Sequence, residues 1–343
     1  MNVQRTVRAI IQRFRASARI PLILMYHRIG NELTDPWGLA VTPAHFEEHL
    51  DALRRTRFPL RLSQFVRQLV AGTLPEQAVA VTFDDGYADN LLVAKPQLAA
   101  ADVPATVFLA TGYLDRPGEF WWDELARLLL LENGPGDLEL VVRGLRMQFD
   151  LGTEHPDRSS TWRAWTAPRT ARHVAYMRIW ETLRRLNEDE RNGLMSNLRS
   201  AFSNDHALSG AGRAMINDEA KALISDGLIE IGAHTVTHPL LTELEPADRS
   251  RELEDSKAAC ERLIGRPVPA FAYPYGDLDP HVRSAVVSAG FGYAVSTVDQ
   301  PVSANFDLFS LPRLQVLDCD GEVFERTVLV TSAGAHLNVV RQA

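Results

Sequence analysis

The feature that most constrains the fold is a repeated alternation of short apolar runs with amphipathic stretches. Strand-like runs are expected near residues 21–26, 78–83, 105–110, 228–233, 268–272, 292–296 and 312–317. Helical patterns are expected near residues 43–55, 88–101, 217–225, 246–264 and 279–289. Strands that alternate with helices favour a largely parallel sheet, so the chain is predicted to be an α/β protein.

Residues 113–212 interrupt this alternation. The segment contains five of the six tryptophans of the chain, namely Trp121, Trp122, Trp162, Trp165 and Trp180. Its pattern predicts a helix from Phe120 to Leu131, a small hairpin over 138–150 and helical structure over 168–202. The tryptophans can build a core of the insertion itself, or some of them can line a binding groove as part of a lid. We expect most of them to build the core.

One of the buried runs ends in a pair of carboxylates. Residues 78–83 read as a strand, and Thr82-Phe83-Asp84-Asp85-Gly86 follows its end. Such strand ends are where α/β folds place their chemistry. Adjacent carboxylates repel each other, and the repulsion is relieved if one binds a cation and the other accepts a proton. An ordinary capped turn would also explain this string alone.

A second run ends in a pair of imidazoles. Residues 228–233 read as a strand, and His234-Thr235-Val236-Thr237-His238 follows. The four-residue spacing lets both side chains converge on one ion, although two unrelated histidines would give the same string. Taken together, the two strings provide three metal ligands and one free base. This is the set that a hydrolytic, zinc-type site requires.

The composition narrows the alternatives. A chain of 343 residues with 45% hydrophobic content can bury a large core. The net charge of −8 makes nucleic acid an improbable partner. Cys260 and Cys319 form no metal or redox motif. Residues 1–15 are basic and amphipathic without the apolar core of a signal peptide, so they predict either a helix packed on the domain or a peripheral contact with an anionic membrane.

At this point the chain resembles a known family, the polysaccharide deacetylases, also called the NodB-homology or carbohydrate esterase 4 group. The strings at Asp84 and at His234 are similar to the first two motifs of the family, and Phe271-Ala272-Tyr273-Pro274-Tyr275-Gly276 is similar to the third. The resemblance implies a distorted (β/α) barrel with a mainly helical insertion. It also implies metal-dependent removal of an acyl group from an amide or ester.

The resemblance assigns roles to individual residues. Asp84 would be the general base, and Asp85, His234 and His238 would hold a divalent metal. Zn²⁺ is the preferred ion, while Co²⁺, Fe²⁺ and Ni²⁺ suit the same ligand types. The backbone N–H of Tyr275 would stabilise the oxyanion. Tyr273 and Pro274 would line the substrate groove.

The chain also departs from the family pattern. Tyr273 stands where many members have an arginine that orients the base, and we expect Arg313 to replace it on the basis of its charge. The C-terminal Leu-X-His that supplies the general acid is missing. His27, in Tyr26-His27 after the first strand, resembles the N-terminal Tyr-His motif of poly-N-acetylglucosamine deacetylases and is the candidate acid; a structural histidine is the alternative. Trp37, in the loop that follows, is a candidate platform for a sugar ring.

These observations predict four parts. They are an N-terminal amphipathic helix (1–19), a deacetylase barrel (20–112 and 213–325), an inserted lid or subdomain (113–212) and a C-terminal tail (326–343). The predicted protein is a cytoplasmic N-deacetylase at or near the inner face of the membrane, acting on an acetylated carbohydrate in a polysaccharide or a glycan precursor. Two alternatives stay open: an amidase for a small non-sugar amide, and a catalytically silent glycan-binding protein.

Overall fold

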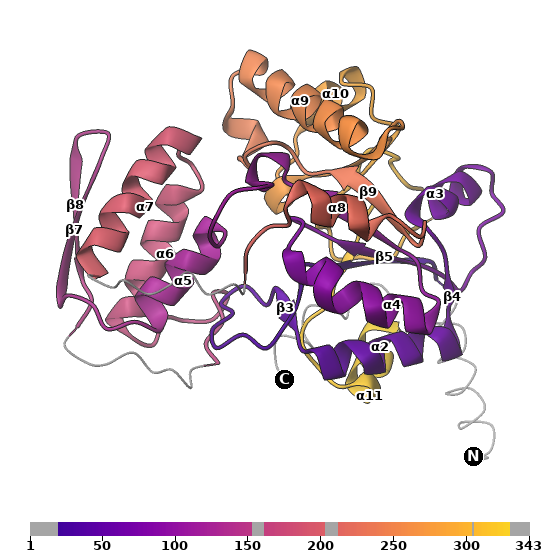
Figure 1. Cartoon of the computed structure of the whole chain (residues 1–343), viewed down its shortest axis with the longest axis horizontal. Coiled ribbons are helices and arrows are strands. Elements are labelled where there is room, and N and C mark those ends of the chain that lie inside the picture. Colours follow the sequence, from indigo (N-terminus) through magenta and orange to yellow (C-terminus); the bar gives the residue numbers. More distant parts are fainter. Residues whose placement is uncertain (1–19, 153–160, 203–211, 304, 330–343) are drawn as a thin grey trace, which may run out of the picture.

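The computed structural model describes residues 20–152, 161–202, 212–303 and 305–329. A curved α/β body and a smaller, mainly helical body lie side by side, with the smaller one on the left of Figure 1. The predicted N-terminal helix over 1–19 lies outside the described residues. In the part of the chain that the structure describes, no helix has both the length and the apolar character needed to cross a bilayer.

A curled sheet of parallel strands forms the centre of the α/β body. Its neighbours follow the order β11-β10-β9-β6-β5-β1-β12, and β4 pairs with the start of β5. The strands are β1 (Leu22–Tyr26), β4 (Phe58–Pro59), β5 (Ala78–Phe83), β6 (Ala105–Leu109), β9 (Ile229–Ala233), β10 (Ala270–Ala272), β11 (Tyr293–Val295) and β12 (Leu314–Gln315). A bridge between Val295 and Leu311 continues the pairing from β11 into the segment that leads to β12. The sheet therefore curls toward a barrel, as the resemblance predicted.

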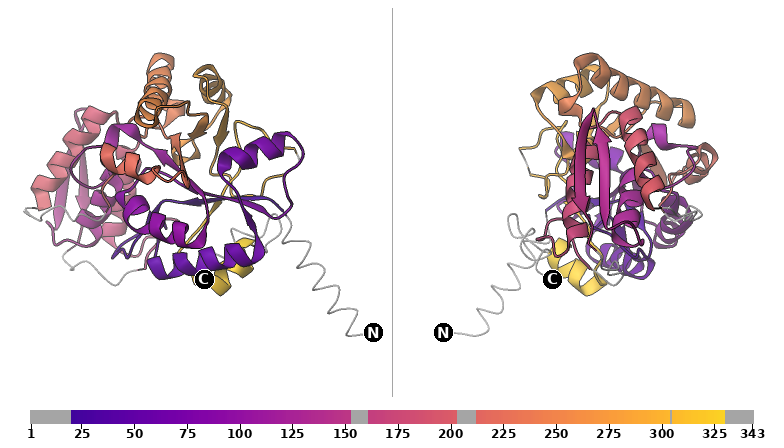
Figure 2. Two further views of the ribbon diagram at one scale, coloured as in Figure 1. Left: turned by 45° about the vertical axis from the view of Figure 1, so that its right-hand side comes forward. Right: turned by 90° about the vertical axis from the view of Figure 1, so that its left-hand side faces the viewer.

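Helices cover the outside of the sheet, as the two views of Figure 2 show. They are α2 (Pro43–Thr56), α3 (Leu62–Val70), α4 (Lys95–Ala101), α8 (Asn217–Leu223), α9 (Pro246–Ile264), α10 (Pro280–Ser288) and α11 (Gly321–Phe324). A π-helical turn, η1 (Asn90–Ala94), precedes α4. Pro96 explains this turn, because proline has no N–H to donate within a regular α-helix. Another π-helical turn, η5 (Glu325–Leu329), follows α11.

Short elements complete the α/β body. Strands β2 (Arg28–Ile29) and β3 (Ala40–Val41) pair with each other after the end of β1. Three 3₁₀ turns occupy Thr111–Tyr113 (η2), Leu241–Glu243 (η3) and Pro274–Gly276 (η4). Val328 and Leu329 pack into the main core, so the segment that the sequence suggested as a tail begins as part of the α/β body.

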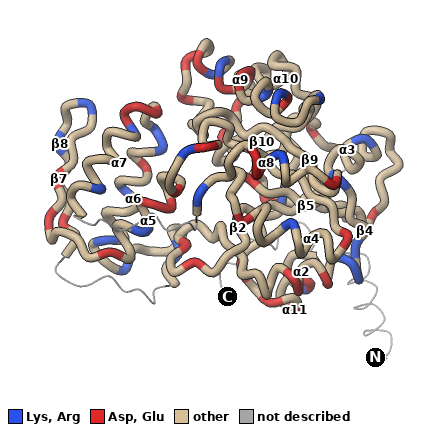
Figure 3. Tube along the Cα trace, viewed as in Figure 1, with Lys and Arg blue, Asp and Glu red and all other residues tan. Residues whose placement is uncertain are grey.

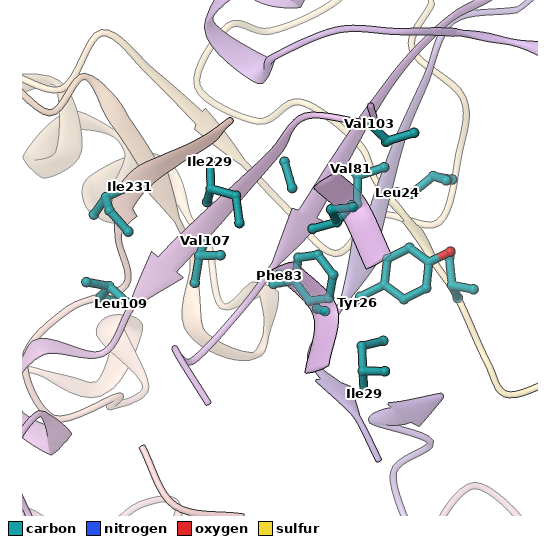
Figure 4. Packing of buried hydrophobic residues seen from close by; sticks show 14 of the residues in the cluster. Leu24, Tyr26, Ile29, Val81, Phe83, Val103, Val107, Leu109, Ile229 and Ile231 are labelled. Carbon is teal, nitrogen blue, oxygen red and sulfur yellow. The ribbon is translucent and has the colours of Figure 1, made fainter. Parts of the chain in front are cut away.

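The two faces of the sheet are buried in separate clusters. Leu24, Val81 and Val107 belong to the large cluster beneath the helices, part of which Figure 4 shows. Ile23 and Phe108, each one position away, belong to the cluster on the opposite face. Successive strand residues point to opposite faces, so both faces need apolar side chains. Each fully buried aliphatic or aromatic side chain contributes about 1.5–3 kcal/mol to this packing.

The insertion has a hydrophobic core of its own. Its elements are α5 (Trp121–Leu130), β7 (Asp137–Val142), β8 (Leu145–Asp150), α6 (Ala171–Leu183) and α7 (Glu188–Phe202). Four tryptophans belong to the buried cluster of this body, namely Trp121, Trp122, Trp162 and Trp180, while Trp165 is half-buried. The hairpin of β7 and β8 lies where alternation predicted it. The predicted helical stretch over 168–202 is two helices separated by a turn.

Candidate metal centre and active site

The sheet register brings the two predicted strings together. Strand β5 pairs with β6, and β6 pairs with β9, so Asp84-Asp85 and His234 follow the carboxyl ends of strands in one sheet. The N–H of His234 donates to the carbonyl oxygen of Leu109 at 2.9 Å. The N–H of Ala110 donates to the backbone carbonyl oxygen of Asp85 at 3.2 Å. The segment after β6 therefore links both strings, although Asp85 and His234 are 149 positions apart in sequence.

Asp85, His234 and His238 form a buried cluster. The Nε2 atoms of His234 and His238 lie 3.5 and 3.4 Å from Oδ1 of Asp85, and the ligand atoms of all three lie within 4.8 Å of one another. Ligands that surround a zinc ion tetrahedrally at about 2.0–2.2 Å lie about 3.3–3.6 Å apart. The three side chains are thus spaced to share one ion.

The surroundings of this cluster favour a cation. Nδ1–H of His234 donates to the carbonyl oxygen of Ala272 at 2.8 Å, which leaves Nε2 free to act as a ligand. Burial lowers the pKa of His238 to about 3, so its imidazole is neutral at physiological pH. Oδ1 of Asp85 is buried without a hydrogen-bond donor. A buried carboxylate oxygen that faces two imidazole nitrogen atoms fits a divalent metal.

Asp84 has a different environment. Its two oxygens accept hydrogen bonds of 2.7 Å each from Nη1 and Nη2 of Arg313. The Arg313 side chain is fully buried, and it also donates to Oγ1 of Thr82 and to the carbonyl oxygen of Ser296. Burial opposes ionisation of Asp84, but the Arg313 charge holds its pKa well below the usual range. Asp84 is therefore a carboxylate fixed by a bidentate partner, while Asp85 faces the imidazoles.

The backbone at the site is unusual. In the described ranges, Asp85, Thr235, His238 and Tyr275 are four of the seven non-glycine residues with positive φ, at 71°, 65°, 55° and 58°. Each such residue costs of order 1 kcal/mol or more and persists only where its surroundings hold it. At Gly86, which also has positive φ, a Cβ atom would lie 2.7 Å from Leu109, so only glycine fits this turn without strain.

A carboxylate from α9 holds the loop between the two histidines. Oε2 of Glu252 accepts hydrogen bonds from the N–H groups of Val236 and Thr237 at 2.7 and 2.9 Å, and Oε1 accepts one from Oγ1 of Thr237 at 2.7 Å. On the insertion side, Nη1 of the buried Arg191 donates to the carbonyl oxygen of Thr237 at 3.0 Å. Sequence reasoning did not identify Glu252 or Arg191, because neither belongs to a local motif.

The cluster opens into a cavity of about 380 Å³. His27, Trp37 and Tyr275 line it together with Asp84 and the three candidate ligands, as the sequence predicted them to gather. Three further lining residues come from the insertion: Trp122 of α5, Trp180 of α6, and Arg184 at the end of α6. The ring centroids of Trp180 and Trp37 are 4.3 Å apart, and those of Trp122 and His238 are 4.9 Å apart. The insertion therefore supplies part of the aromatic wall of the site.

Two predicted substrate contacts lie elsewhere. The Tyr273 side chain is fully buried, and its hydroxyl donates to the carbonyl oxygen of Phe309 at 2.8 Å. Pro274 is buried as well, and neither residue lines the cavity. The placement differs from the prediction that both contact substrate, because Tyr273 packs into the core directly after β10. Tyr275, two positions further along, is the residue of this motif that reaches the cavity.

Comparison with known families agrees with this geometry. The family model described as polysaccharide deacetylase matches residues 71–134 and 196–294, which contain the aspartate pair and the histidine pair. Over these residues the chain is similar to the polysaccharide deacetylases. The Bacillus subtilis protein YxkH is 24% identical to it over 102 residues, which cover 30% of this chain and 36% of YxkH. The match thus spans about a third of that relative.

Solved structures of deacetylases share the fold. The Streptococcus pyogenes deacetylase PplD superposes with a TM-score of 0.58 at 19% identity, covering 91% of this chain and 99% of PplD. IcaB from Ammonifex degensii superposes with a TM-score of 0.54 at 16% identity, covering 87% of this chain and 92% of IcaB. At these identities the likeness concerns the fold, and it confirms the predicted α/β architecture with a curled parallel sheet.

Proposed function

We propose that this protein is a metal-dependent carbohydrate N-deacetylase of the polysaccharide deacetylase family, with the metal held by Asp85, His234 and His238. One observation carries the proposal: a buried Asp-His-His cluster lies beside a second carboxylate, Asp84, in one cavity. The Streptococcus pyogenes relative is described in complex with acetate, the acid that hydrolysis of an N-acetyl group releases. We prefer Zn²⁺, which the ligand types and their spacing suit.

The residues around the candidate metal centre have defined tasks in this proposal. A divalent ion would supply a Lewis acid for the acyl carbonyl and lower the pKa of attacking water from about 15.7 toward 7. Asp84, which Arg313 holds in place, accepts a proton from that water; each of its oxygens keeps a second lone pair for this purpose. The N–H of Tyr275 donates to the oxygen on which negative charge develops.

The leaving amine needs a proton, because an amine anion is a poor leaving group. We propose that His27 supplies it, as the early-strand histidine of the poly-N-acetylglucosamine deacetylase branch would. His27 lies between β1 and β2 and lines the cavity that contains Asp84 and Asp85. The carbonyl oxygen of His27 accepts a hydrogen bond of 2.9 Å from Nδ2 of Asn90, which ties this position to the η1 turn.

The catalytically silent alternative rested on two departures from the family pattern. The bidentate contact between Arg313 and Asp84 supplies the orienting cation that Tyr273 cannot, so one departure has a structural replacement. The position of His27 offers a replacement for the other. These two placements favour an active enzyme over a glycan-binding protein without turnover.

The test is acetate release from N-acetylglucosamine oligomers by the metal-depleted protein before and after Zn²⁺ is added. We expect release only with the metal, and loss of release in Asp84→Asn. Turnover that survives in Asp84→Asn would contradict the assignment of the base. Turnover of small non-sugar amides, with none of the oligomers, would favour the amidase alternative.

We further propose a cytoplasmic site of action, with peripheral contact between residues 1–15 and the inner face of the membrane. The support is the basic, amphipathic sequence of that segment. Flotation with anionic liposomes should carry the full chain but not a variant without residues 1–15. Equal, negligible flotation of both would remove the membrane contact from the proposal.

A further inference from the structure

The turn that carries Tyr275 has a strained backbone. Tyr275 and Gly276 both have positive φ, at 58° and 70°. A non-glycine residue in this conformation persists only where its surroundings hold it. At Gly276 a Cβ atom would overlap the side chain of Thr297, which lines the active-site cavity together with Tyr275. The turn therefore needs contacts from other parts of the molecule to keep its shape.

Asp277, directly after this turn, bonds to the loop that follows the histidine pair. Its Oδ2 accepts a hydrogen bond of 2.7 Å from the N–H of Thr242, and the Thr242 hydroxyl lies 2.8 and 2.9 Å from Oδ1 and Oδ2. The N–H of Asp277 donates to the carbonyl oxygen of Pro274 at 2.9 Å, which closes the turn. One carboxylate thus joins the Tyr275 turn to Thr242, although Asp277 and Thr242 are 35 positions apart in sequence.

Thr242 lies in η3, which α9 holds in place. Nε and Nη2 of the buried Arg249 donate to the carbonyl oxygens of Leu241 and Leu244, at 2.8 and 2.9 Å. Glu252, which holds the histidine loop, follows Arg249 by three positions, so both side chains lie on the same face of α9. Figure 3 shows charges of both signs along this helix. Two of these charged residues therefore support η3 and the histidine loop from one helix face.

The contact of Asp277 with Thr242 joins the two loops that face each other at the site. His238 belongs to the loop after β9, and Tyr275 belongs to the loop after β10. The ring centroids of His238 and Tyr275 are 4.5 Å apart. Strands β9 and β10 pair through Ala233 and Phe271, before either loop begins. Contacts between the loops therefore set the distance from the candidate metal centre to the N–H of Tyr275.

We infer that Asp277 is a positioning residue for deacetylation, which holds the N–H of Tyr275 where the oxyanion forms. The inference rests on the proposed function, because it concerns the oxyanion donor of that reaction. In the part of the chain that the structure describes, Asp277 is not among the residues that line the active-site cavity, so it acts through the turn. Glu252 acts on the loop of the metal ligands, whereas Asp277 acts on the oxyanion donor.

The first measurement compares acetate release by Asp277→Ala and wild type at saturating Zn²⁺, with N-acetylglucosamine oligomers as substrate. We expect kcat to fall about 10²-fold while KM and zinc affinity stay unchanged, because a displaced donor weakens binding of the transition state alone. Asp277→Asn keeps a carbonyl oxygen for the N–H of Thr242 and should restore kcat. The control Asp279→Ala removes the carboxylate that caps α10 through the N–H of Val282, so it should lower the midpoint of urea unfolding but not kcat.

A second measurement does not depend on turnover. Methylphosphonate has a tetrahedral, negatively charged centre that mimics the intermediate of acetyl transfer to water, so its affinity for the zinc-loaded protein reports on the oxyanion donor. We expect Asp277→Ala to weaken methylphosphonate binding about tenfold. Thr242→Val, which removes the hydroxyl at the other end of the contact, should weaken it in the same direction, and Asp279→Ala should bind it as tightly as wild type.

The inference is overturned if Asp277→Ala matches Asp279→Ala in kcat and in methylphosphonate affinity, or if its loss appears in zinc affinity instead. It is also overturned if Asp277→Asn fails to restore kcat, or if wild-type protein binds no methylphosphonate. Methylphosphonate binding that depends on Asp277, without any acetate release by wild type, would contradict the proposed function while supporting the role of Asp277. Acetate release that does not depend on Asp277 would have the opposite meaning, so the two failures are distinguishable.

Discussion

Replacement of Arg313 by methionine should destabilise the protein strongly and in a pH-dependent way. Arg313 is fully buried, and it is bonded to both oxygens of Asp84, whose side chain is 3% exposed. Removing one partner of a buried ion pair leaves an uncompensated charge and costs about 3–5 kcal/mol. That is a large part of the roughly 5–15 kcal/mol by which a domain is stable, so the variant should still fold but with a much lower free energy of unfolding.

The pH dependence follows from the pKa of Asp84. In the wild type this pKa is held below the value of about 3.9 in an unfolded chain, so the stabilisation is present above pH 4 and lost as the pH falls further. Without Arg313, burial would raise the pKa of Asp84 above the unfolded value. The folded variant would then take up a proton as the pH falls, and its deficit in stability should shrink from pH 8 toward pH 5.

The assay is urea unfolding of the metal-depleted protein at pH 5 to 8 for wild type, Arg313→Met, Asp84→Asn and the double variant. We expect a coupling energy of about 3 kcal/mol between the two positions at pH 8. Arg172→Met is the control, because Arg172 is buried and, among the described residues, donates to the carbonyl oxygens of Leu129 and Glu132 and not to a carboxylate. Additive single effects, or a deficit for Arg313→Met that does not change with pH, would refute the reasoning.

Three further predictions concern other parts of the site. Glu252→Gln should weaken zinc binding about 10- to 100-fold in a competition titration, because Glu252 holds the loop that carries His238. The control Glu254→Gln should bind zinc as tightly as wild type, and equal zinc affinities of the two variants would contradict the role of Glu252. His27→Gln should lower kcat for an N-acetyl sugar about 10²- to 10⁴-fold. The rate of 4-nitrophenyl acetate hydrolysis should not change, because its leaving group needs no proton. An equal loss of rate on both substrates argues against His27 as the acid. Burial, partly offset by Arg28, raises the pKa of Asp123 to about 7. The folded state therefore keeps a proton that the unfolded chain loses near pH 4, and the free energy of unfolding falls between pH 4 and pH 7. In urea unfolding, Asp123→Asn should gain stability relative to wild type from pH 5 to pH 8, and a difference that stays constant with pH would contradict this.

Local sequence patterns predict much of this molecule. The run over 78–83 is entirely buried, and the apolar, β-branched composition that marks it as a strand also marks Asp84 and Asp85 as the residues at its end. The strand before His234, Ile229–Ala233, is buried except for Glu230, which is half-buried, and its end likewise marks the histidine pair. Because parallel strands of one sheet end at one edge, two strings at strand ends predict a shared site even when the chain between them is long.

Other features depend on contacts between distant elements. Arg313 meets Asp84 across 229 positions, and only its charge suggested this role before the register of β12 against β1 was known. Glu252 and Arg191 act on the histidine loop from α9 and α7, and no local pattern distinguishes them from other charged helix residues. Trp122 and Trp180 belong both to the core of the insertion and to the wall of the cavity. Composition identifies such residues as buried but does not show which of them border the site.

Zinc titration of the metal-depleted protein by calorimetry tests the central claim most directly. The account predicts one tightly bound ion per wild-type chain, binding that is lost in Asp85→Asn, His234→Ala and His238→Ala, and unchanged binding in His281→Gln, which alters an exposed histidine of α10. Wild-type chain that binds no ion, or ligand variants that bind zinc as well as His281→Gln does, would contradict it.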